Sequence, residues 1–195
     1  MSSKERKEFQ LEIFLSRARR IQNDILDLSH LGFSLVGLQN KNEQESIEIL
    51  QAFPEQLLKE SHDMSSCYQI LYCFENDLRK IINDVMEDSF GTNWWKQKVR
   101  NNIKTDVRKR QEAEKNSVFF ARVDDPLYFT TLGELKEIIS DNYDAFANHF
   151  RSQKFVEELL FQINRLRIVV GHNCMLEEMD MTTLRQNIER WYKIK

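Results

Sequence analysis

The stretch SCYQILYCFENDLRKIINDVMEDSFG (residues 66–91) decides the fold class of this chain. Its apolar residues recur at spacings of three and four, so that on a helix they keep to one face within an arc of about 100°. These residues are Leu71, Phe74, Leu78, Ile81, Ile82 and Val85. Ser66 and Gln69 fit the S-x-x-Q capping box, and Gly91 is typical of a helix end. The stretch therefore predicts a long core helix between Ser66 and Gly91.

The composition of the whole chain favours helices as well. Its 195 residues are 41% hydrophobic and 30% charged but include only five glycines and two prolines, which leaves few residues for the turns of a sheet. The length suffices for one sizeable domain with an appendage. We therefore predict an all-α fold, with a helical bundle at residues 63–195 preceded by an N-terminal helical arm at residues 1–62.

The arm carries a heptad-like repeat between about residues 4 and 29. The repeating residues are Leu11, Phe14, Ala18, Ile21, Ile25 and Leu28. Their flanking positions lack complementary charges, which favours a packed bundle helix over a free coiled coil. A second helical stretch is expected from about Asn42, interrupted at Pro54 and ending near His62. Such a short arm is too small to hold a core by itself.

Charge excludes a globally basic nucleic-acid binder, because the net charge is −3. One local patch stands out: residues 96–115 hold eight Lys/Arg against three Asp/Glu. The candidate RNA contacts there are Arg100, Lys104, Arg108, Lys109 and Arg110. The alternative is an ordinary solvated helix, which the charge run alone favours. Trp94 and Trp95, just before the patch, are more typical of a sealed core edge than of a base-stacking surface.

The cysteines and the N-terminus bear on the cellular compartment. Cys67, Cys73 and Cys174 form no CxxC pair, and an odd number argues against a disulfide framework or a zinc knuckle. The first residues lack the apolar core of a signal peptide, and no apolar run approaches the length of a membrane span. We expect a cytoplasmic protein that binds no metal and no cofactor.

Three further helices are predicted towards the C-terminus. Thr131 and Glu134 form a T-x-x-E capping box before LGELKEIISDNY. The next helix covers residues 152–171, and Asp180 is expected to cap a final helix. On a helical wheel, Phe155, Val156, Leu159, Leu160, Ile163, Leu166 and Val170 share one face.

Arg167 falls inside that apolar arc, whereas Arg165 falls opposite it. A permanently charged guanidinium on a core face needs a partner or a ligand. Ile168 and Val169 lie outside the arc, so the last turn is apolar on nearly every side and is expected to be covered by a second subunit. The assembly expected is a homodimer.

His172 follows five residues after Arg167 and would point about 140° away from it if the helix simply continued. A helix break at Gly171 is expected to turn the imidazole towards the arginine. The alternative is structural: Arg167 pairs with a buried carboxylate such as Glu75, and His172 caps the helix end.

In its context, the Arg-x-x-x-x-His spacing resembles the HEPN superfamily, all-helical domains of which many cleave RNA. The runs that carry the resemblance are LYCFENDLRKIINDVMEDSFGTNWW, the basic segment, YFTTLGELKEIISDNY and INRLRIVVGHN. Together they are similar to one branch, found at the end of a eukaryotic RNA-surveillance endonuclease and in bacterial conflict systems. The resemblance covers about residues 66–195.

The resemblance implies metal-independent RNA cleavage at a composite site where two copies of the motif meet across a dimer. Arg167 and His172 match the catalytic pair of the family, and Glu75 is a candidate for orienting Arg167. An imidazole moves the proton of the 2′-hydroxyl, and an arginine holds the phosphorane. The expected partners are RNA and, through the arm, a cognate antitoxin or another protein, as for a toxin or defence effector.

The alternative is a non-catalytic HEPN module that binds RNA or a protein partner. It rests on one departure from the family pattern. The residue after the motif arginine is commonly polar, often Asn, and here it is Ile168.

Overall fold

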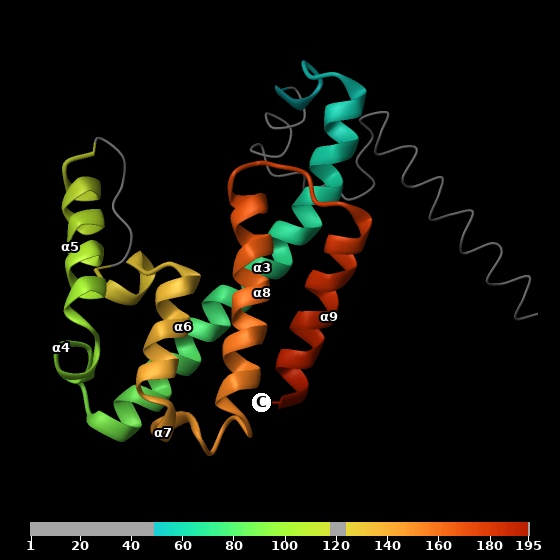
Figure 1. Ribbon diagram of the computed structural model, residues 1–195. Coiled ribbons are helices and arrows are strands. Elements are labelled where there is room, and N and C mark those ends of the chain that lie inside the picture. The colour runs from blue at the N-terminus through green and yellow to red at the C-terminus, as the bar shows by residue number, and fades with distance from the viewer. Residues whose placement is uncertain (1–48, 118–123, 195) are drawn as a thin grey trace, which may run out of the picture. The chain divides into compact units, whose positions relative to one another are not determined.

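The computed structural model describes residues 49–117 and 124–194 (Figure 1). Every regular element in these ranges is helical, which confirms the all-α prediction for them. None of their helices combines the length and apolarity needed to cross a membrane. The repeat predicted at residues 4–29 lies outside the described ranges. The chain divides into two compact units, Met1–Leu58 and Lys59–Lys195, and the packing described below is that of the second.

Helix α3 (Glu55–Phe90) is continuous over 36 residues. The predicted helix end near His62 and the predicted start at Ser66 are therefore wrong. No glycine or proline interrupts the chain between Glu55 and Phe90, and Ser or Gln inside a helix costs less than breaking it. The predicted end at Gly91 is confirmed: this residue has a φ of 75°, which glycine adopts without strain.

The basic segment forms two helices, α4 (Trp94–Lys98) and α5 (Asn101–Lys115). They are separated at Val99, whose backbone is extended and whose side chain is buried. Trp94 is buried and Trp95 packs against it edge-on, with ring centroids 5.6 Å apart. The tryptophans thus close an edge of the core, as the sequence favoured.

The chain then forms η1 (Pro126–Phe129), a short 3₁₀ helix, followed by α6 (Leu132–Asp141) and α7 (Tyr143–Phe146). The capping box predicted at the start of α6 is confirmed. The Thr131 hydroxyl accepts from the Glu134 N–H at 3.2 Å, and the Glu134 carboxylate accepts from the Thr131 N–H at 2.7 Å. This double cap fixes where the chain enters the bundle.

Helices α8 (Gln153–Gly171) and α9 (Glu178–Ile194) complete the fold. Figure 1 shows α8 between α6 and α9, with both of which it is in contact. Its buried residues are Val156, Leu159, Leu160, Ile163 and Val170. Phe155 is exposed instead, because it lies in the first turn at the margin of the core. Asp180 lies inside the first turn of α9 and does not precede it, so its predicted capping role is wrong.

Aromatic packing joins α3 to the C-terminal helices. Trp191 is fully buried, with its ring centroid 5.5 Å from that of Phe74 and 4.9 Å from that of Phe150. Edge-to-face and tilted contacts of this kind add to the stabilisation from buried area. They anchor α9 on α3 at Phe74, which belongs to the same buried cluster as Leu71 and Leu78.

Candidate functional site

The end of α8 fixes the backbone of the Arg-x-x-x-x-His motif. Gly171 is the last helical residue, and the left-handed residue is Asn173, with a φ of 55°. The Cys174 N–H donates to the Val169 carbonyl at 3.1 Å and the Asn173 N–H to the Val170 carbonyl at 3.0 Å, which is a Schellman motif. The predicted helix end at Gly171 is therefore confirmed, but Gly171 does not turn the chain as expected. The left-handed residue is Asn173, because asparagine also tolerates this conformation.

His172 caps α8 through its backbone. Its N–H donates to the carbonyls of Ile168 at 3.1 Å and Val169 at 3.2 Å. The imidazole is exposed and makes no hydrogen bond or ion pair within residues 49–117 and 124–194. Because the backbone stays helical up to Gly171, the imidazole leaves α8 about 140° around its axis from Arg167. The structure does not bring these two side chains of one chain together.

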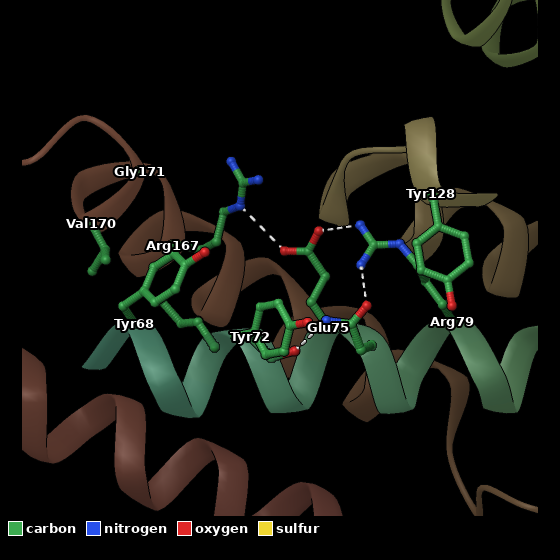
Figure 2. Close-up of a pocket in the computed structure, with 10 residues that line it drawn as sticks. Tyr68, Tyr72, Glu75, Arg79, Tyr128, Arg167, Val170 and Gly171 are labelled. Carbon is green, nitrogen blue, oxygen red and sulfur yellow. Dashed lines mark hydrogen bonds and ion pairs between the residues drawn. The ribbon is translucent and has the colours of Figure 1, made fainter. Parts of the chain in front are cut away.

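Arg167 meets Glu75 of α3, as the structural alternative anticipated. Its Nε donates to Glu75 Oε2 at 3.3 Å, and the other oxygen of that carboxylate accepts from Arg79 (Figure 2). The side chains of Glu75 and Arg79 are 13% and 11% exposed, whereas that of Arg167 is 40% exposed. One nearly buried carboxylate thus links an internal arginine to an arginine at the surface.

Arg79 fixes the position of this carboxylate. Its Nε donates to the Leu127 carbonyl at 3.0 Å and its Nη2 to the Thr130 carbonyl at 3.3 Å. Its guanidinium also lies 5.7 Å from the ring centroid of Tyr128. These bonds connect α3 with η1, so Glu75 is held by a group that is itself held from two sides.

The terminal nitrogens of Arg167 remain available. Glu75 accepts only from Nε, and Figure 2 shows both terminal nitrogens pointing away from this carboxylate. Within the part of the chain that the structure describes, no hydrogen bond or ion pair engages them. A planar guanidinium held at Nε and open at its two ends is suited to grip a phosphate with two hydrogen bonds.

These side chains line a groove of about 390 Å³ between α3, η1 and the end of α8. Its charged residues are Glu75, Arg79 and Arg167, which leaves a formal charge of +1. Its aromatic residues are Tyr68, Tyr72 and Tyr128. His172 does not line it. The groove therefore offers a positive, aromatic surface to an anionic ligand.

The candidate RNA contacts on the basic segment all have partners within the chain. Arg100 binds Asp141 and also lies 3.5 Å from Glu137, and Lys104 donates to the Lys96 carbonyl at 2.9 Å. On α5, the other pairs are Arg108 with Glu112 at 3.8 Å, Lys109 with Asp106 at 3.2 Å and Arg110 with Glu134 at 2.8 Å. Arg108 and Lys109 are the two most exposed and most weakly held of these cations.

Reversing the charge of Arg108 and Lys109 together to Glu tests whether α5 follows an RNA backbone. If it does, affinity for single-stranded RNA should fall, and the slope of log K against log salt should flatten by roughly 1 or more. Arg110 is left intact because it pairs with Glu134. Unfolding in urea should show stability unchanged within about 0.5 kcal/mol. An unaltered salt slope would assign these residues to ordinary solvated surface.

Arg110 has a structural role next to the start of α6. It donates to both oxygens of Glu134 at 2.8 Å and to the Phe129 carbonyl at 2.6 Å. Burial disfavours the charged form of Glu134, but hydrogen bonds from Arg110 and Thr131 outweigh this effect and lower the pKa of its carboxyl. The pair joins α5 to the start of α6.

The lowered pKa of Glu134 predicts an acid-sensitive contribution to stability. This contribution is present above the unfolded pKa of about 4.3 and is lost as the pH falls through the lower folded-state pKa. We expect Glu134→Gln to be less stable than the wild type at neutral pH and the difference to shrink on acidification, as measured by urea unfolding. Glu112→Gln, at an exposed pair, is the control with little effect. A constant difference across this range would contradict the assignment.

Sequence reasoning missed four charged or aromatic residues of the groove, Arg79, Tyr68, Tyr72 and Tyr128, and also Asn76. Arg79, Tyr68 and Tyr72 could have been predicted from their spacing. Arg79 lies four residues after Glu75, and Tyr72 lies four residues after Tyr68, so each pair shares a face of one helix. The position of Tyr128 could not have been predicted in this way, since its approach to Arg79 depends on how η1 packs on α3.

The described residues contain no group of three or more His, Cys, Asp or Glu side chains arranged to hold a metal ion. Comparison with family models, with curated proteins and with solved structures found no match to this chain.

Proposed function

We propose that the protein is a HEPN-like endoribonuclease that cleaves RNA without a metal ion, at a site completed by a second copy of the chain. The observation that carries the proposal is the state of Arg167. Its Nε is fixed by Glu75, and its terminal nitrogens open onto a positive, aromatic groove. This arrangement is suited to the phosphate of a nucleic acid.

A second copy is proposed because one chain keeps the two motif side chains apart. The His172 imidazole leaves α8 on another side than the Arg167 guanidinium. Between them on the helix surface, Ile168 is 45% exposed. A two-fold contact at this end of α8 covers Ile168 and places the imidazole of one copy near the guanidinium of the other.

Two copies supply both proton-transfer groups that the reaction needs. One imidazole takes the proton of the 2′-hydroxyl, whose oxygen attacks the neighbouring phosphorus. The bond to the 5′-oxygen breaks, and the protonated imidazole of the other copy donates its proton to that oxygen. Arg167 stabilises the added negative charge of the phosphorane, and the products are a 2′,3′-cyclic phosphate and a 5′-hydroxyl.

A role as a toxin or defence effector, with an antitoxin or other protein docking on the N-terminal arm, belongs to the same proposal. The second candidate is a non-catalytic HEPN module that binds RNA or a protein partner. Exposed Ile168, at the position where the family commonly has a polar residue, favours it.

The assembly is tested by light scattering at micromolar concentration. We expect a two-fold dimer, and we expect Ile168→Asp to shift it to monomer, because a charge cannot be buried at an apolar contact without a partner. Phe155→Asp changes another exposed apolar residue near the opposite end of α8 and should leave the dimer intact. A wild-type monomer would contradict the composite site.

The activity is tested by incubating purified protein with single-stranded RNA in EDTA. We expect cleavage of RNA and no cleavage of DNA, because the nucleophile is the 2′-hydroxyl of the substrate. Intact RNA, or cleavage that requires magnesium, would favour the binding module.

A further inference from the structure

We infer that Tyr68 and Tyr72 form a base-stacking subsite for an unpaired RNA strand whose phosphate is bound by Arg167. This inference rests on the proposed action on RNA and deepens it by naming the form of RNA that the groove accepts. It concerns binding, so it is tested separately from cleavage.

The first support is the exposure of the two rings. Tyr68 and Tyr72 are each 60% exposed, and they lie one turn apart on the α3 face that lines the groove (Figure 2). Their ring centroids are 6.2 Å apart and their planes are tilted by 32°, so the rings form one continuous aromatic surface. Bases of any sequence stack on such surfaces.

The second support is the position of the phosphate-binding group. Arg167 projects into the same groove, and its terminal nitrogens are the open donors described above. Aromatic faces beside a guanidinium match the alternation of bases and phosphates along a single strand. From Tyr68 to Arg79 the groove follows α3 for about 16 Å.

The groove chemistry also selects the occupant. The terminal nitrogens of Arg167 open onto the groove, which disfavours an apolar peptide because that ligand would cover these charged donors without accepting a hydrogen bond from them. A duplex keeps its bases stacked inside the helix and cannot present their faces to Tyr72. An unpaired strand presents the faces of its bases to the tyrosines and its phosphates to Arg167.

The test measures RNA binding in the His172→Ala background, so that cleavage does not interfere. The probe is a short fluorescent single-stranded RNA, with the same sequence as a duplex for comparison. We expect Tyr72→Leu to weaken binding of the single strand by about 5- to 150-fold, which is the usual effect of losing one stacked base. Tyr72→Phe keeps the ring and should bind like the parent, and Phe155→Leu removes an exposed aromatic residue elsewhere on α8 and should have no effect.

An abasic version of the probe provides the second arm. It should bind the parent more weakly, and Tyr72→Leu should weaken it no further, because no base remains to stack. Equal binding by Tyr72→Leu and the parent, equal losses in Tyr72→Leu and Tyr72→Phe, or a preference for the duplex would overturn the inference. If the probe is bound as expected but the wild-type protein never cuts it, the subsite stands and the proposed cleavage fails.

Discussion

Replacing His172 by Ala is expected to lower the rate of the proposed RNA cleavage by about 10²–10⁴-fold or more, because the composite site then lacks the imidazoles of both copies that move protons. The fold should persist, since the side chain is exposed and α8 is capped by the backbone N–H of this residue. Single-turnover cleavage and urea unfolding, measured on the same preparation, separate the two effects.

His149→Ala is the matched control, because His149 is also exposed but lies before α8 and away from the groove. Arg167→Lys should impair cleavage as well, since an ammonium cannot reproduce the planar grip on a phosphate. Full activity in both His172→Ala and Arg167→Lys would show that the pair is not catalytic.

The second large effect is expected at Glu75. Glu75→Met leaves the nearly buried Arg79 without a carboxylate among the described residues and should lower the free energy of unfolding by about 3 kcal/mol. It also releases Nε of Arg167, and a misplaced guanidinium should reduce cleavage by up to about 100-fold. Chemical unfolding and cleavage rates are the two measurements.

The double variant Glu75→Met with Arg79→Met separates stability from orientation. Replacing both members of a buried ion pair by apolar residues commonly restores stability, and the Leu127 carbonyl keeps its bonds from Thr130. Stability should therefore recover in large part, while cleavage stays low because Arg167 still lacks its hydrogen bond to Glu75. Recovery of both stability and the cleavage rate would mean that Glu75 affects cleavage only by stabilising the fold.

Local patterns predicted those parts of the fold that local interactions determine. The apolar face of α3, its end at Gly91 and the capping box at Thr131 each depend on residues within a few positions of one another. The same reasoning placed a helix start at Ser66, because a capping pattern inside a continuous helix looks the same in sequence as one at its beginning.

The site was predictable to a smaller extent. A guanidinium on an apolar face demands a partner, and Glu75 was a candidate from its place on the long helix; the structure has this ion pair. The involvement of Arg79 and Tyr128 depends on the packing of η1 against α3, over separations of about fifty residues that no local pattern records. The direction of His172 depended on whether the left-handed residue was Gly171 or Asn173, and both residue types adopt that conformation.

Analysis of the RNA ends tests the central claim most directly. The purified protein is incubated in EDTA with a single-stranded RNA and with the same strand carrying 2′-deoxynucleotides at the cleaved positions. Cleavage through the 2′-hydroxyl predicts 2′,3′-cyclic phosphate and 5′-hydroxyl ends on the RNA and no cuts at the deoxynucleotides. Products with 3′-hydroxyl ends, or cuts at the deoxynucleotides, would contradict cleavage by Arg167 and His172.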